Sequence, residues 1–220
     1  MALTHQEILN RTHAAGIIPV FNHPDLDIAK AVVDHSYEAG VRVFEFTNRE
    51  KNAFEVFKAL RIYAEKYPDL LLGIGTIFTR DDAQRFLYAG TDFVVSPAML
   101  PEVGAFCRMK QVFWVPGCAT LTEVYNGKVL GAKLVKTFPG NLLGPAFIKA
   151  AHSVIPDIKL MPTGGVEPTE TNLKDWFSAG VHCVGMGSQL IDRKEIERGD
   201  FGGLKHRIAL SLDIIKSLRK

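Results

Sequence analysis

Lys136 is the residue whose type and setting could support covalent chemistry. It lies near the end of an apolar run that Pro139 and Gly140 interrupt. Because an ammonium group is costly to remove from water, burial on a strand would favour the neutral amine. A neutral amine attacks carbonyl carbon, which is the first requirement of Schiff-base chemistry. An ordinary solvated lysine is the alternative that this segment alone leaves open.

Glu45 and Arg49 supply two other functions that such chemistry needs. Glu45 is flanked on both sides by apolar residues, and a partly desolvated carboxyl group suits proton transfer. A salt-bridged structural glutamate is the alternative. Arg49 follows four residues later, and its planar guanidinium could bind a substrate carboxylate through two hydrogen bonds. Taken alone, such an arginine is more often a solvated loop charge, and its short distance in sequence from Glu45 is what makes it a candidate.

Three further residues are candidates for a binding pocket. Thr76 follows the segment from Gly73 to Gly75, and its hydroxyl could bind a substrate oxygen or cap the next helix. Pro97 and Phe138 stand in the rigid dipeptides Ser-Pro and Phe-Pro, which suit pocket walls or plain packing equally well.

Two glycine-rich segments near the end of the chain could bind phosphate. The first contains Thr163, Gly164 and Gly165, and the second contains Gly187 and Ser188. Glycine lets the backbone approach an anion closely, and α/β barrels often bind phosphate after their last two strands. One glycine pair is usually just a turn, but two after consecutive strands indicate a phosphate site.

The elements that must position these residues repeat along the chain. Helix-like stretches end at Gly40, Gly90, Gly131 and Gly180, and each is followed by an apolar, strand-like run. The strands that we predict are 17–21, 41–46, 70–75, 91–97, 112–115, 132–136, 159–161 and 181–187. The helices that we predict between and around them are 4–15, 26–39, 53–67, 81–89, 101–110, 121–130, 145–155, 172–179 and 201–218.

This alternation predicts an α/β fold, a (β/α)8 TIM barrel with an extra N-terminal helix, in a single domain spanning residues 1–220. A doubly wound open sheet is the structural alternative. In a barrel the active site lies at the carboxyl ends of the strands. Glu45 and Lys136 each stand five residues after a helix-ending glycine, so we expect both at the same strand position. Lys133 lies three residues before Lys136 and should therefore face the other way.

Composition narrows the class of protein. The chain has 220 residues, is 47% hydrophobic and 23% charged, and carries a formal net charge of +2 without a basic run. We therefore expect no nucleic-acid partner and no membrane association. Its N-terminal residues lack the pattern of a signal peptide. The odd number of cysteines, Cys107, Cys118 and Cys183, favours packing roles in a reducing compartment. The histidines show no metal-ligand spacing, so we expect no bound metal.

Together these motifs resemble the class I aldolases that cleave 2-keto-3-deoxy-6-phosphogluconate (KDPG) and 4-hydroxy-2-oxoglutarate (KHG). The resemblance extends from about Ile17 to about Leu190. The segments that carry it, in order, are 18–20, 43–49, 73–76, 95–97, 116–117, 136–139, 162–165 and 185–188.

The resemblance implies roles for the candidate residues. Lys136 would be the Schiff-base lysine and Glu45 the general acid/base. Arg49 and Thr76 would hold the pyruvate carboxylate, and Pro97 and Phe138 would be pocket walls. The phosphate end would lie against Thr163, Gly164, Gly165, Gly187 and Ser188. It also implies a cytoplasmic homotrimer that needs no cofactor and acts on a small-molecule 2-keto acid.

One departure from the family pattern bears on the substrate. Many members carry an arginine two residues after the Pro-Val pair of the first strand, where this chain has Asn22 followed by His23. We therefore expect less positive charge near the substrate. The sequence leaves open the 6-phosphogalactonate epimer and unphosphorylated acids. It also leaves open a phosphate-binding barrel isomerase or synthase, and a sugar-acid binding protein without catalysis.

Overall fold

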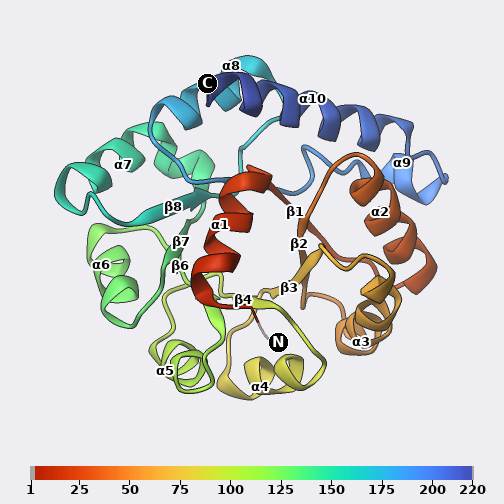
Figure 1. Cartoon of the computed structure of the whole chain (residues 1–220), viewed down its shortest axis with the longest axis horizontal. Coiled ribbons are helices and arrows are strands. Elements are labelled where there is room, and N and C mark those ends of the chain that lie inside the picture. Colours follow the sequence, from red (N-terminus) through yellow and green to blue (C-terminus); the bar gives the residue numbers. More distant parts are fainter. Residues whose placement is uncertain (1–2, 220) are drawn as a thin grey trace.

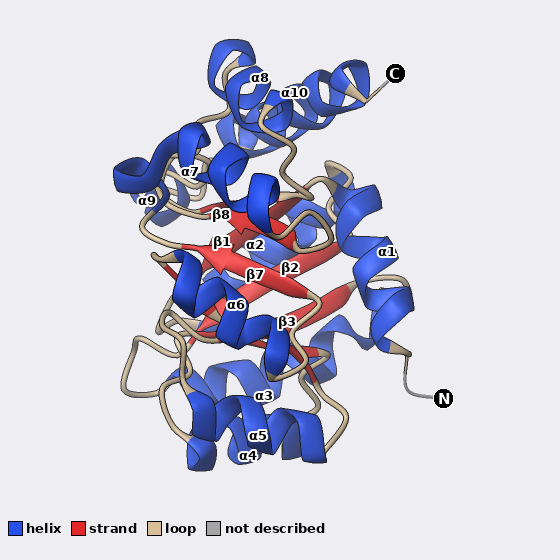
Figure 2. Ribbon diagram, turned by 90° about the vertical axis from the view of Figure 1, so that its left-hand side faces the viewer, coloured by secondary structure: helices blue, strands red, loops and turns tan. Residues whose placement is uncertain are grey.

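Helices alternate with short strands through the part of the chain that the computed structural model describes, residues 3–219. Figure 1 shows the strands gathered at the centre with helices around them, and Figure 2 shows the same strands from the side. The expectation of an α/β fold with parallel strands is confirmed. None of the helices in residues 3–219 combines the length and apolarity needed to cross a bilayer.

The element boundaries follow the predicted order. The strands are β1 (Ile17–Phe21), β2 (Val43–Thr47), β3 (Leu71–Gly75), β4 (Phe93–Val95), β5 (Phe113–Val115), β6 (Gly117–Cys118), β7 (Leu134–Thr137), β8 (Lys159–Pro162) and β9 (Val184–Met186). The helices are α1 (His5–Ala15), α2 (Leu26–Glu38), α3 (Ala53–Tyr63), the 3-10 turn η1 (Ala64–Lys66), α4 (Arg80–Tyr88), α5 (Pro101–Met109), α6 (Leu121–Val129), α7 (Gly140–Val154), α8 (Glu170–Ser178), α9 (Arg193–Glu197) and α10 (Gly202–Leu218).

The strands form two parallel sheets, with the orders β5-β4-β3-β2-β1-β9 and β6-β7-β8. Backbone contacts cross both gaps between these sheets. At one gap, Pro116 alone separates β5 from β6 in the chain, and Gly117 of β6 lies against the backbone of Pro97, which follows β4. At the other gap, Thr163 forms a parallel bridge with Gly185. The two sheets therefore contact each other at both of their edges.

Apolar side chains pack on both faces of the strands. One cluster contains Phe44, Phe46 and Leu72 together with helix residues, so it fills the layer between strands and helices. A second cluster contains Val43, Leu71 and nine other buried residues drawn mostly from strands, so it lies on the opposite strand face. Strand residues alternate between the two clusters, as a period of two requires.

Helix α1 covers one end of the strands. Its Ile8 belongs to the second cluster, the one inside the ring of strands. The His5 ring lies 5.7 Å from the Phe113 ring in an edge-on arrangement. Figure 2 places α1 at one end of the strand bundle and α9 at the other. A capping box formed by Thr4 and Glu7 begins this helix. The opposite end, where the strands finish, is thereby left for a site.

The predicted helix ends are confirmed in backbone detail. Gly40, Gly90, Gly131 and Gly180 have φ values of 109°, 88°, 100° and 96°. This left-handed region favours glycine, so each residue ends its helix and turns the chain into the following strand. The three cysteines are buried and free, as packing residues should be, and burial raises the pKa of each thiol to about 12.

Two local features were not predicted. The helix expected from Pro145 is present, but a further helical turn from Gly140 precedes it, and Gly144 separates the two segments with φ 65° and ψ 173°. Pro145 starts the second segment, for which its ring is suited. The short helix α9 was not predicted, although Asp192 caps it by accepting a hydrogen bond from Lys194 N–H. Five residues are too few to show helical periodicity.

Candidate active site

Lys136 and Glu45 meet inside the ring of strands. Each is the third residue of its strand, β7 and β2 respectively, as the predicted register requires. Lys136 Nζ lies 3.5 Å from Glu45 Oε1, with side-chain exposures of 5% and 0%. Lys133 is exposed, so the register prediction that chose Lys136 is confirmed. A buried amine beside a buried carboxyl group can exchange a proton without leaving the protein interior.

The contact between these two groups is loose. Charge-assisted N–H···O bonds are usually about 2.7–2.9 Å long, so 3.5 Å leaves the carboxylate uncommitted to the lysine. Within residues 3–219, neither Glu45 oxygen has a hydrogen-bond partner. A buried carboxylate without partners is unfavourable, and such groups in native proteins usually have a functional reason. Glu45 is therefore free to act on a ligand.

Gly75 creates the space that Glu45 occupies. A β-carbon at this position of β3 would overlap the Glu45 carboxyl group. On the same strand, a β-carbon at Gly73 would overlap the Phe93 ring instead. The missing side chain thus leaves room for the Glu45 carboxyl group at Gly75 and for the Phe93 ring at Gly73.

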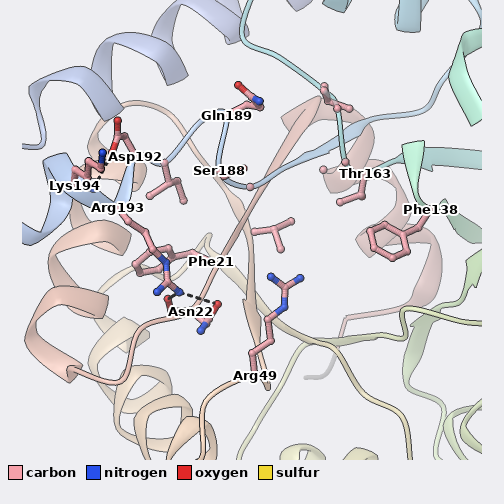
Figure 3. A pocket seen from close by; sticks show the side chains of 17 residues that line it. Phe21, Asn22, Arg49, Phe138, Thr163, Ser188, Gln189, Asp192, Arg193 and Lys194 are labelled. Carbon is pink, nitrogen blue, oxygen red and sulfur yellow. Dashed lines mark hydrogen bonds between the residues drawn. The ribbon is translucent and has the colours of Figure 1, made fainter. Parts of the chain in front are cut away.

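Phe138 connects the buried pair to an open cavity. Lys136 Nζ lies 5.4 Å from the centre of the Phe138 ring. The same ring lines a cavity of about 570 Å³. Six further predicted site residues line the same cavity. One is Arg49, and the other five belong to the two glycine-rich segments: Thr163, Gly164, Gly165, Gly187 and Ser188. Figure 3 shows Arg49, Phe138, Thr163 and Ser188 around one hollow.

Arg49 enters the cavity from the loop after β2. Its backbone N–H is bonded to Thr47 O at 3.0 Å, and its side chain is exposed. Figure 3 shows the guanidinium pointing into the hollow between Phe138 and Asn22. A fork of N–H donors in this position can hold a carboxylate or a phosphate group.

The glycine segments after β8 and β9 lie next to each other. Gly164 and Gly165 have φ values of 88° and 71°, a conformation that other residues adopt only with strain. The Thr163 side chain lies directly over Gly185, where a β-carbon would overlap its hydroxyl. Thr163 Oγ1 is buried and has no partner within the described residues. This wall of the cavity therefore offers a free hydroxyl and a closely approachable backbone.

Thr76 and Pro97 lie outside the lining of the cavity. Thr76 directly follows Gly75, the residue that faces Glu45, and has φ 62°. A threonine in this region is strained, and such strain is most often found at functional sites. Pro97 packs its backbone against Gly117, with no room for a side chain there. Both are half-buried at strand ends, so the structure places them near the pair but not in the cavity.

Sequence reasoning missed the part of the site that α9 contributes. Asp192, Arg193 and Lys194 all line the cavity, together with Asn22. Arg193 Nη2 donates to the Asn22 carbonyl oxygen at 3.2 Å. The expected loss of positive charge near Asn22 is therefore offset by a residue 171 positions later. The lone signal in the sequence was the N-cap pattern at Asp192, which says nothing about where Arg193 points.

Comparison with known proteins shows similarity to aldolases that act on 2-keto-3-deoxy sugar acids. The family model described as KDPG and KHG aldolase matches residues 8–206. A 2-dehydro-3-deoxy-phosphogluconate aldolase of Treponema pallidum is 32% identical over 200 residues, covering 90% of this chain and 93% of the relative. A 2-dehydro-3-deoxy-6-phosphogalactonate aldolase of Escherichia coli is 36% identical over 121 residues, covering 54% and 58%.

A solved structure shows the same arrangement of the backbone. The KDPG aldolase of Legionella pneumophila, with pyruvate captured as a covalent carbinolamine intermediate, superposes with a TM-score of 0.79 at 26% identity. The superposition covers 96% of this chain and 97% of that chain.

Proposed function

This chain belongs to the KDPG and KHG aldolase family, and we propose that it cleaves 2-keto-3-deoxy-6-phosphogluconate to pyruvate and glyceraldehyde 3-phosphate. The observation that carries the proposal is the buried pair in which Lys136 Nζ lies 3.5 Å from Glu45 Oε1, beneath an open cavity. An amine and a carboxyl group in this relation supply the nucleophile and the proton carrier that a class I aldolase needs.

Lys136 provides the covalent step. Its neutral amine attacks the C2 ketone of the 2-keto acid and forms a carbinolamine, which loses water to give a protonated imine. The imine then accepts the electron pair of the C3–C4 bond, and this bond breaks to leave an enamine of pyruvate. Because the imine is the electron sink, the reaction needs neither a cofactor nor a metal ion.

Glu45 moves the protons. It removes the proton of the C4 hydroxyl as the C3–C4 bond breaks, so that C4 leaves as the aldehyde carbon of glyceraldehyde 3-phosphate. It then returns a proton to C3 of the enamine, and hydrolysis of the imine releases pyruvate and frees Lys136. The lack of any other hydrogen-bond partner for either carboxyl oxygen within residues 3–219 supports this role.

The remaining predicted residues would orient the substrate. Arg49 would bind the C1 carboxylate with help from Thr76, and Phe138 and Pro97 would bound the pyruvyl part. The phosphate end would lie against the two glycine segments, at Thr163–Gly165 and Gly187–Ser188. Fixing both ends of the substrate places C2 over the lysine, which lowers the entropic part of the barrier.

We propose two related substrates for the same site. KHG would be cleaved to pyruvate and glyoxylate by the same steps. The similarity to a phosphogalactonate aldolase favours the C4 epimer as a second candidate, since the epimers differ only in the position of one hydroxyl.

We further propose that the two sheets act as one closed (β/α)8 barrel in a single domain, with α1 as an extra helix. The backbone contacts across both sheet gaps support closure. A cytoplasmic homotrimer is part of the same proposal. Helix α6 exposes Leu121, Tyr125 and Val129 at a spacing of four residues, and an exposed apolar stripe of this kind suits a contact between copies.

The direct test is turnover of the purified protein on four acids, with pyruvate release as the readout. The acids are KDPG, its galactonate epimer, the unphosphorylated 2-keto-3-deoxygluconate, and KHG. We expect the highest kcat/KM with one of the two phosphorylated acids. Absence of pyruvate release from all four acids by a folded protein would contradict the proposal.

A further inference from the structure

Arg193 is held at the rim of the cavity by a small polar cluster. Its Nη2 donates to the Asn22 carbonyl oxygen at 3.2 Å and lies 3.5 Å from Asn22 Oδ1. Asn22 is 5% exposed and donates from Nδ2 to Glu50 Oε1 at 3.0 Å. This chain of contacts joins α9 to the end of β1 and to the loop after β2.

The cluster leaves most of the Arg193 guanidinium unused. Within residues 3–219, its side-chain hydrogen bonds all start at Nη2, whereas a guanidinium carries five N–H donors. Arg193 Nη2 also lies 4.0 Å from Glu50 Oε1, and the side chains of Arg193 and Glu50 are 52% and 37% exposed. Ion pairs of this kind contribute little to stability, so exchanging Glu50 for an anionic ligand would cost Arg193 little.

The position of Arg193 relative to the cavity is specific. It lines the same cavity as Ser188 and the glycine segment at Gly164 and Gly165. Figure 3 shows its side chain reaching down from α9 toward Asn22, on the side of the hollow away from Phe138. Phe138 marks the lysine end of the cavity, because its ring lies 5.4 Å from Lys136 Nζ. Arg193 therefore faces the end of a bound substrate that is remote from the reacting carbon.

The charge balance of the cavity favours an anion. Of its three lining cations, Arg49 is assigned to the C1 carboxylate, which leaves Arg193 and Lys194, and Asp192 is the one carboxylate among the described residues that line the cavity. Asp192 accepts a hydrogen bond from the Lys194 backbone N–H at 2.8 Å and is thus occupied with capping α9. A group with two or more negative oxygens would satisfy the free donors of Arg193.

We propose that Arg193 is a specificity-determining residue that binds the terminal phosphate of the substrate, with Asn22 as its positioning residue. The proposal rests on the proposed aldolase function and names the part of the substrate that this chain selects. Asn22 contacts the cation that α9 supplies through its backbone carbonyl oxygen at 3.2 Å and through its side-chain Oδ1 at 3.5 Å. Arg193 makes the protein prefer a phosphorylated 2-keto-3-deoxy acid to the same acid without phosphate.

The test compares Arg193→Gln with Arg198→Gln on two substrates that differ only in the phosphate. Arg198 ends the same short helix and does not line the cavity, so its replacement removes the same charge from the same helix. We expect Arg193→Gln to lower kcat/KM for the phosphorylated acid by about 10- to 100-fold, mainly through KM, as loss of a charged hydrogen bond predicts. The unphosphorylated acid should respond much less, because it offers no anion at this end. Arg198→Gln should resemble the wild type on both.

Inhibition by phosphate and a second variant give two further tests of phosphate binding by Arg193. Inorganic phosphate should compete with the phosphorylated acid in the wild type, and Arg193→Gln should weaken that inhibition. If Arg193→Gln does not fold, Arg193→Lys retains the charge without the fork and should show a partial, still phosphate-selective loss.

Equal losses on both acids, or no loss on either, would overturn the role of Arg193. Borohydride trapping of pyruvate on Lys136 separates this failure from the failure of the proposed function. An intact adduct with no phosphate-selective effect leaves the aldolase function standing and removes Arg193 from it. No adduct in the wild type would remove both proposals.

Discussion

The two ends of the strand ring differ in whether their buried polar groups have hydrogen-bond partners. At the end that α1 covers, His182 Nε2 lies 3.0 Å from both Thr12 Oγ1 and the Leu9 carbonyl oxygen. Arg219 donates to the carbonyl oxygens of His13 and His182. At the other end, both oxygens of Glu45 and the hydroxyls of Thr47, Thr137 and Thr163 lack partners within residues 3–219. Outside the strand ring, the buried hydroxyl of Ser36 on α2 also lacks a partner among these residues.

This difference separates groups that stabilise the fold from groups that act on a ligand. A buried hydrogen bond contributes about 1 kcal/mol, and a buried polar group left without a partner costs about 1–3 kcal/mol. The covered end gains from its contacts, whereas the open end bears a cost that a bound ligand or an ordered water can offset. Substitutions at the open end should therefore change activity, and those at the covered end should change stability.

The largest effect should come from Lys136→Met at the open end. Methionine has a similar volume but no amine, so the covalent step is lost and turnover should fall on the order of 10⁶-fold, as for other catalytic nucleophiles. Pyruvate release with a phosphorylated acid measures this, and circular dichroism checks the fold. Lys133→Met is the matched control, because Lys133 is exposed three residues earlier and should be replaceable. Substantial activity in Lys136→Met would refute the covalent mechanism.

Glu45→Gln should have the second largest effect. The amide cannot carry the proton, so kcat should fall by about 10²–10⁴-fold. Because neither Glu45 oxygen has a hydrogen-bond partner within residues 3–219 and the contact with Lys136 is 3.5 Å long, replacing one oxygen by a neutral NH2 group should not lower the free energy of unfolding. Urea unfolding of wild type and variant measures that difference. A variant that stays fully active would remove Glu45 from proton transfer, and one that unfolds easily would contradict the contrast between the two ends.

Gly75→Ala tests whether the space around Glu45 is needed. The added methyl group would overlap the carboxyl group and displace it, and a shift of about 1 Å at a reacting group can cost roughly 10²-fold in rate. Gly73→Ala is the control on the same strand, since its methyl group would press on the Phe93 ring. Each change should also destabilise the fold by about 1–3 kcal/mol through overpacking.

The comparison that decides this test is kcat per folded molecule. It should fall much further in Gly75→Ala than in Gly73→Ala. Equal losses would show that strand packing, and not the position of the Glu45 carboxyl group, limits the rate.

The smallest effect concerns the covered end and depends on pH. Burial lowers the pKa of His182 from 6.5 to about 4. The unfolded chain therefore binds this proton first, and stability that is present at neutral pH is lost as the pH falls from about 6.5 to about 4. The loss should reach on the order of 2–3 kcal/mol.

Replacing His182 by glutamine should flatten that pH dependence, whereas His206→Gln on the exposed face of α10 should not. Urea unfolding at pH 7 and pH 5 gives the comparison. An unchanged slope in His182→Gln would show that other groups govern acid stability at this end.

The sequence was sufficient to locate the buried pair that we propose as catalytic, because the position of the pair depends on local rules. Helix-ending glycines set the start of each strand, and a period of two then fixes which side chains face inward. Lys136 and Glu45 follow from these two facts alone. The alternation of elements, the buried cysteines and the glycine segments could be predicted for the same reason.

Arg193 could not be predicted because its role depends on tertiary structure. The residue lies far along the chain from Asn22 and reaches it only when α9 folds against the end of β1. A five-residue helix has no periodicity to reveal its orientation. For Thr76 and Pro97 the sequence predicted the strand-end positions correctly. It could not show whether their side chains line the cavity, and they do not.

The central claim is that Lys136 forms an imine with pyruvate beside Glu45. Borohydride reduction in the presence of pyruvate, followed by peptide mass mapping, tests it most directly. We predict a reduced pyruvyl adduct on Lys136, absent from Lys136→Met and present in Lys133→Met. No adduct in the folded wild-type protein, or an adduct on Lys133, would contradict the account.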